Sequence, residues 1–155
     1  MTQDLNLIDA IQIAMEAERK AAAFYADAAQ KTETLGRELL EQLAQFERHH
    51  YDILEKLIAT LREKGSYVEY EGKELTVPTP SEAQTEKEPQ RMSMMGIITT
   101  AMDIEEQAEK RYNTLAGQTD DPDGKAMFER LAYEEGKHQL ILKEAYVSLN
   151  RNGVW

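Results

Sequence analysis

Two Glu-x-x-His units, Glu47–His50 and Glu135–His138, are the residues of this 155-residue chain whose types and spacing most clearly suggest chemistry. Each unit interrupts a series of leucines at helical spacing, so a carboxylate and an imidazole lie on the helix side that should be buried. Residues three apart on a helix are neighbours, and carboxylate oxygen with imidazole nitrogen suits iron or manganese. The two units therefore predict a metal site inside the protein.

Two lone glutamates, Glu18 and Glu105, interrupt apolar stripes in the same way. With a turn near residue 33, Glu18 and Glu47 lie 15 residues before it and 14 residues after it. With a second turn near residue 120, Glu105 and Glu135 each lie 15 residues away. At about 1.5 Å of rise per residue, the four glutamates come to one level along the helices. A shared site requires that coincidence, whereas helical periodicity does not.

Four buried carboxylates at one level repel one another, and each costs several kcal/mol in lost hydration unless cations neutralise it. Two divalent ions would balance four carboxylates, with two neutral imidazoles completing the set. Di-iron and di-manganese bundles use this pattern of two Glu and two Glu-x-x-His. We therefore expect two iron ions, with manganese or a mixed pair as the alternative. A bundle that kept these residues but binds no metal is the competing interpretation.

Tyr25 and Tyr112 each follow one of the lone glutamates by seven residues, two helical turns along the same face. Two interpretations are equally open. Each ring simply fills the core, or each hydroxyl donates a hydrogen bond to a ligand carboxylate from the opposite half of the chain.

Several neighbouring polar residues fall off the apolar stripes by helical angle. His49 lies about 100° around the helix from His50, so we expect it at the surface. For the same reason we expect four nearby acidic residues to be solvated, namely Glu16, Glu106, Glu109 and Glu134.

Helical periodicity dominates the chain and predicts an all-α, single-domain protein covering 1–155. Helices are expected over about 7–31, 35–64, 92–117 and 125–149, with Gly65 ending the second. The two helical pairs resemble each other: EAERKAAAFYADAA aligns with DIEEQAEKRYNTLA, and LAQFERHHYDIL aligns with LAYEEGKHQLIL. The linker at about 65–91 is long enough for a crossover, and its SYVEYEGKELTV portion is expected to form an extended or hairpin piece.

Composition narrows the class of protein. The formal net charge is −11, which disfavours binding to nucleic acid or to an anionic membrane. We see no membrane-spanning run and no export signal, and there is no cysteine, so we expect a cytoplasmic protein without disulfides or thiolate metal sites.

The motifs ERKAAAFY, LAQFERHH, EEQAEKRY and FERLAYEEGKH together resemble rubrerythrin-type proteins of the ferritin-like superfamily. The resemblance implies an antiparallel four-helix bundle of two hairpins, with a crossover between the second and third helices. It also implies a non-haem di-iron site in which Glu47 and Glu135 bridge the metals and Glu18 and Glu105 are terminal ligands. A homodimer is implied as well, for which Met92, Met94, Met95 and Trp155 are candidate interface residues.

The chain departs from the rubrerythrin pattern in two ways. Rubrerythrins that reduce peroxide usually carry a rubredoxin domain with cysteine-bound iron, so without cysteine the electron donor is expected to be a separate protein. Many also have a further glutamate three residues after the third-helix ligand, where this chain has Ala108. We expect an oxidoreductase that reacts with peroxide or dioxygen. The alternatives are a ferroxidase serving iron storage or delivery, and a structural metal-binding bundle without catalysis.

Overall fold

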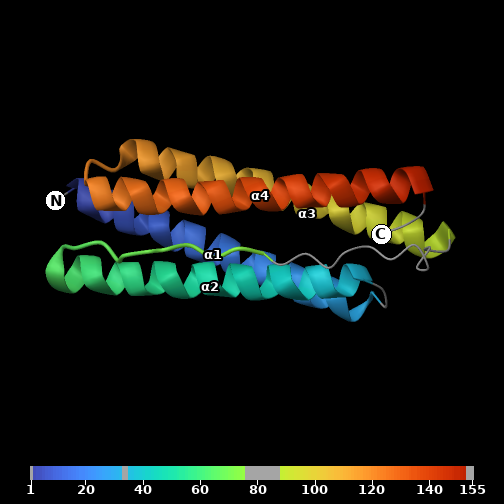
Figure 1. The fold of residues 1–155 in the computed structure, drawn as a ribbon. Helices are drawn as coiled ribbons and strands as arrows, with labels where there is room; N and C mark the ends of the chain where they lie inside the picture. The colour runs from blue at the N-terminus through green and yellow to red at the C-terminus, as the bar shows by residue number, and fades with distance from the viewer. Residues whose placement is uncertain (1, 33–34, 76–87, 153–155) are drawn as a thin grey trace.

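The computed structural model describes residues 2–32, 35–75 and 88–152 and consists there of four long helices (Figure 1). These are α1 (Thr2–Gln30), α2 (Leu35–Lys64), α3 (Glu88–Gln118) and α4 (Pro122–Asn152). Helices α1 and α2 pack along each other as one hairpin, and α3 and α4 pack as the other. The predicted all-α four-helix bundle is therefore confirmed.

The helix ends follow local chemistry more closely than hydrophobic periodicity. α4 begins at Pro122, three residues before the predicted start, because Asp121 Oδ1 accepts hydrogen bonds from the backbone N–H groups of Asp123 and Gly124 at 2.9 and 3.1 Å. Proline at the first helical position and aspartate before it are both favourable. α2 ends at Lys64, where Gly65 has a φ of 65° and its N–H donates to Leu61 O at 3.0 Å.

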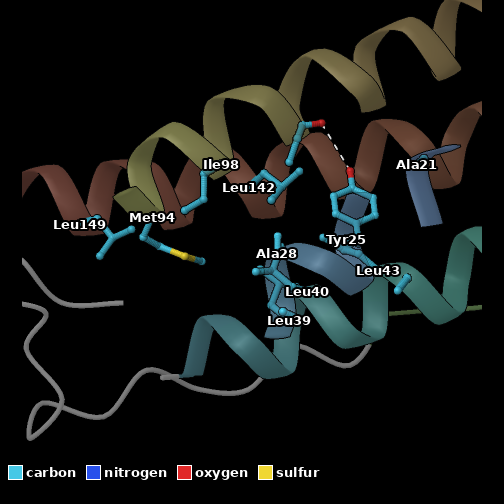
Figure 2. Close-up of a cluster of buried hydrophobic side chains, with 13 residues drawn as sticks. Ala21, Tyr25, Ala28, Leu39, Leu40, Leu43, Met94, Ile98, Leu142 and Leu149 are labelled. Carbon is cyan, nitrogen blue, oxygen red and sulfur yellow. Dashed lines mark hydrogen bonds between the residues drawn. The ribbon is translucent and has the colours of Figure 1, made fainter. Parts of the chain in front are cut away.

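Two apolar clusters fill the bundle, one on each side of a polar layer. The first unites the C-terminal half of α1 with the start of α2, the start of α3 and the end of α4 (Figure 2). The second unites the N-terminal half of α1 with the end of α2, the end of α3 and the start of α4. In every helix the predicted metal ligands fall between the two clusters, whereas Tyr25 belongs to the first cluster and Tyr112 to the second. The apolar packing therefore holds the polar layer at a fixed height along the bundle.

Residues 65–75, which we call the strap, leave the end of α2 and run back along the bundle in an extended conformation (Figure 1). Tyr67 lies against Phe128 of α4, with ring centroids 6.3 Å apart, and Tyr70 lies near the rings of His49 and His50 of α2. The strap contains neither helix nor strand, so the extended alternative for its sequence is the correct one. α3 already begins at Glu88, which shortens the predicted linker, and the remainder, 76–87, lies outside the described residues.

None of the described helices has the length and apolar character needed to cross a membrane.

Candidate metal centre

The six residues predicted from spacing meet at one place in the bundle. They form two sets of four, and within each set one ligand atom per residue lies within 4.8 Å of the others. The first set is Glu18, Glu47, His50 and Glu135, and the second is Glu47, Glu105, Glu135 and His138. Glu47 and Glu135 belong to both sets. The arrangement could hold two adjacent cations, with Glu47 and Glu135 available to both.

The side chains of the cluster are buried and only partly satisfied. All six are at most 2% exposed. Among the described residues, five of their atoms have no well-aligned hydrogen-bond partner: Glu47 Oε1, Glu105 Oε2, both carboxylate oxygens of Glu135, and His138 Nδ1. Unpaired buried polar atoms are rare because each costs about 1–3 kcal/mol or more. Divalent cations would satisfy this donor set, so the residues fit a two-metal site.

The two glutamates common to both sets favour their protonated form when no cation is bound. Burial raises the pKa of Glu47 well above its ordinary value, and the charges of Glu105 and Glu18 raise it further. Burial and the charges of Glu105 and Glu47 do the same to the pKa of Glu135. Glu47 and Glu135 are therefore the carboxylates that most need a cation in order to ionise.

The terminal glutamates and the histidines behave in the opposite way. Burial alone would raise the pKa of Glu105, but the neighbouring Glu135 carboxyl group and the charge of His138 lower it to about 2. Hydrogen bonding to Glu47 and the charge of His50 likewise outweigh burial and lower the pKa of Glu18. Burial opposes protonation of His138, yet Glu105 and Glu47 raise its pKa to about 9. Without cations the cluster balances its charge with protons, which divalent metals would displace.

Each hairpin supplies a tyrosine to the other hairpin's terminal carboxylate. The Tyr25 hydroxyl donates to Glu105 Oε1 at 2.7 Å, and the Tyr112 hydroxyl donates to Glu18 Oε1. Both rings are fully buried, so they also fill the core. The two interpretations of these tyrosines are therefore both part of the structure, and the paired hydrogen bonds hold Glu18 and Glu105 in place from opposite sides.

Glu134 is not solvated, contrary to the prediction. Its side chain is 2% exposed, because the strap covers the face of α4 on which it lies. It accepts hydrogen bonds from His50 Nε2 at 2.8 Å, the Lys73 backbone N–H at 2.8 Å, Arg130 Nε at 3.2 Å, and the Tyr70 hydroxyl. Glu134 thus connects the strap to the outer nitrogen of a candidate ligand.

A glycine allows the strap to come this close to α4. Gly72 has a φ of 90°, and a Cβ added there would lie 2.2 Å from Arg130 Nε. A side chain at this position would therefore displace Arg130 and the carboxylate that it pairs with. Helical periodicity could not reveal this contact, because the strap is not helical. The one signal in the sequence is that Glu134 directly precedes the predicted ligand Glu135.

The other acidic neighbours and His49 are placed more nearly as expected. Glu16 and Glu106 are exposed and pair with Arg19 and Lys110. Glu109 is partly buried and accepts a hydrogen bond from Gln139 at 3.0 Å. His49 is also partly buried, beside Tyr70.

Two surface clefts reach the cluster from different sides. A cleft of about 240 Å³ between α1 and α3 is lined by Glu18, Glu47 and Glu135, with Ala21 and Ala108 among its walls. A second, of about 340 Å³, lies between the strap and α4 and reaches Glu134 and His138. Ala108 occupies the position at which many rubrerythrins have a further glutamate, and its small side chain lines the first cleft. The first cleft therefore ends against the candidate bridging carboxylates, which are themselves buried.

Comparison with known proteins agrees with the fold and identifies the family. The solved structure of a hypothetical protein from Pyrococcus furiosus is similar, with 28% sequence identity and a TM-score of 0.70, covering 93% of this chain and 90% of that one. No curated protein matches the sequence. The Rubrerythrin family profile matches residues 1–58 and 96–154, the two segments that contribute all six candidate ligands. The chain therefore belongs to the rubrerythrin family.

Proposed function

We propose that the protein is a non-haem di-iron oxidoreductase that reacts with peroxide or dioxygen. The observation that carries the proposal is the pair of ligand sets sharing Glu47 and Glu135, with buried carboxylate oxygens left unpaired. Glu18 and His50 would complete one iron position, and Glu105 and His138 the other. Two ferrous ions held there would supply two electrons together, enough to convert hydrogen peroxide and two protons into two waters.

The surrounding residues support a reaction with a small oxidant. Oxygen and imidazole ligands suit iron, and manganese is the alternative metal for the same set. The α1–α3 cleft ends against Glu18, Glu47 and Glu135, so only a thin layer of the bundle separates solvent from the proposed iron positions. Tyr25 and Tyr112 fix the terminal carboxylates, so that the ligand set is in place before an oxidant arrives. None of the 155 residues is a cysteine, so we propose that electrons come from a separate donor protein.

Metal loading and oxidation test the proposal in two steps. Metal-free protein is titrated anaerobically with Fe(II), then mixed with hydrogen peroxide, and bound iron and remaining Fe(II) are measured. We expect two irons per chain, and one peroxide consumed for each pair of irons oxidised. Binding well below two irons, or bound iron that peroxide oxidises no faster than iron in buffer, would refute the proposal.

The same experiment separates the alternatives. Iron storage predicts continued uptake of iron far beyond two per chain and a large assembly. A structural bundle predicts two metals that do not react with either oxidant. Glu109→Gln is a suitable control, because this carboxylate lies near the cluster but belongs to neither ligand set.

A further inference from the structure

The two halves of the cluster have different surroundings. Glu134 precedes Glu135, and in the related hairpin the residue preceding Glu47 is Phe46. Glu134 accepts a hydrogen bond from His50 Nε2, whereas the Phe46 ring packs edge-on against both histidines, with its centroid 4.4 Å from that of His138 and 5.1 Å from that of His50. Both candidate ligand histidines therefore contact the same apolar ring, and His50 has in addition a buried carboxylate at its outer nitrogen.

We propose that Glu134 makes the two metal positions unequal by fixing His50, so that the position formed by Glu18, Glu47, His50 and Glu135 binds metal more tightly. This inference rests on the proposed metal binding. His50 Nδ1 faces the cluster, 2.7 Å from Glu135 Oε1 and 3.4 Å from Glu18 Oε1, while Nε2 faces Glu134. A hydrogen bond from Nε2–H to a carboxylate fixes the tautomer and ring orientation and makes Nδ1 a stronger donor to a metal.

The strap helps to position Glu134 and, through it, His50. Glu134 is held by the Tyr70 hydroxyl, the Lys73 backbone N–H and Arg130 as well as by His50. These donors hold its carboxylate at a defined angle beside the buried His50 imidazole. Tyr70 therefore acts on His50 through Glu134, and both are positioning residues for the nearer metal position.

Stepwise loading with Co(II) tests the inference, because cobalt reports ligation by its visible spectrum. The full-length, metal-free protein is titrated with Co(II), and two binding constants are fitted. In the wild type we expect a tight and a weaker step. Glu134→Gln, which keeps the shape and removes the charge, should weaken the tight step by about 10–100-fold and leave the weaker step within about threefold. Tyr70→Phe should weaken the same step by less.

The controls separate positioning from general damage. Glu134→Ala should weaken the tight step more than Glu134→Gln, because the hydrogen-bond acceptor is lost as well. Glu109→Gln should change neither step. The exchangeable imidazole N–H resonance of His50, shifted by bound Co(II), should move in Glu134→Gln, whereas that of His138 should not.

Three results would overturn the inference: equal steps in the wild type, equal weakening of both steps in Glu134→Gln, or no weakening at all. If the wild type binds no Co(II) and no Fe(II), the proposed function fails with it. If two Fe(II) bind and react while the cobalt steps are equal, only this inference fails.

Discussion

The α1–α2 hairpin and the α3–α4 hairpin have the same inner face and different outer faces. Toward the bundle axis each supplies one lone glutamate, one Glu-x-x-His unit and one tyrosine, and each tyrosine reaches the other hairpin's glutamate. Away from the axis the match ends, because Glu134 of α4 corresponds to Phe46 of α2. Two-fold equivalence is therefore kept where six side chains meet one another, and it is lost where α4 meets the strap.

Removal of a shared carboxylate should have the largest effect on this equivalence. Glu47→Ala or Glu135→Ala takes a ligand from both positions, so each variant should bind well below one iron per chain. Glu18→Ala or Glu105→Ala affects one position and should leave about one iron. Elemental analysis after anaerobic loading measures this. If Glu47→Ala retained as much iron as Glu18→Ala, Glu47 would not be shared.

The stability of the metal-free protein should depend on pH, because its buried cluster holds protons where metal ions would bind. The pKa of His138 is raised to about 9 and that of His50 well above its ordinary value, while those of Glu47 and Glu135 are also raised. Groups with raised pKa values stabilise the fold at low pH and lose that contribution as pH rises through their folded values. The lowered pKa of Glu105, about 2, acts oppositely and matters only in acid.

We therefore expect the free energy of unfolding of the metal-free protein to fall from about pH 4.5, the ordinary pKa of the two raised glutamates, to beyond pH 9. Loading with two divalent ions should flatten this dependence, because cations then replace the protons. Urea denaturation at a series of pH values, with and without metal, measures both curves. A metal-free protein whose stability rises over this interval would contradict the expectation.

The apolar clusters on either side of the polar layer contain a matched pair of leucines. Leu54 and Leu142 are related by the internal repeat and are both fully buried, one in each apolar cluster. Leu54→Ala and Leu142→Ala should each lower the free energy of unfolding by about 2–5 kcal/mol, since each leaves a cavity. Measured by urea denaturation, the two losses in free energy of unfolding should be similar, and their difference should be smaller than either loss. A negligible loss in one variant would mean that its cluster does not support the bundle.

Sequence periodicity was sufficient for the helices and for the residues that face the axis. Each helix presents a repeating stripe, and Glu18 or His50 is conspicuous because its neighbours on that stripe are apolar. The burial of Glu134 does not follow from this pattern. Its helical angle places it outside the stripe, and it is buried only because Tyr70 and Lys73 of a non-periodic segment lie over it. Burial by a strap depends on tertiary packing that no helical pattern contains.

The smallest expected effect comes from the two tyrosines that donate to a glutamate of the other hairpin. Their removal is the most sensitive test of whether the hairpins are equivalent. Tyr25→Phe removes a donor to Glu105, and Tyr112→Phe removes one from Glu18, while each ring stays in the core. A buried carboxylate that loses one hydrogen bond should cost about 1–3 kcal/mol in the metal-free protein, and both variants should still bind two irons. Urea denaturation measures the loss, and the double variant measures coupling. Glu18 and Glu105 both lie close to Glu47 and Glu135, so the two losses should not simply add. Losses that are equal and coupled would mean that the hairpins act as one symmetric unit at the axis; a loss confined to Tyr112→Phe would mean that the asymmetry at Glu134 and His50 extends into the cluster itself.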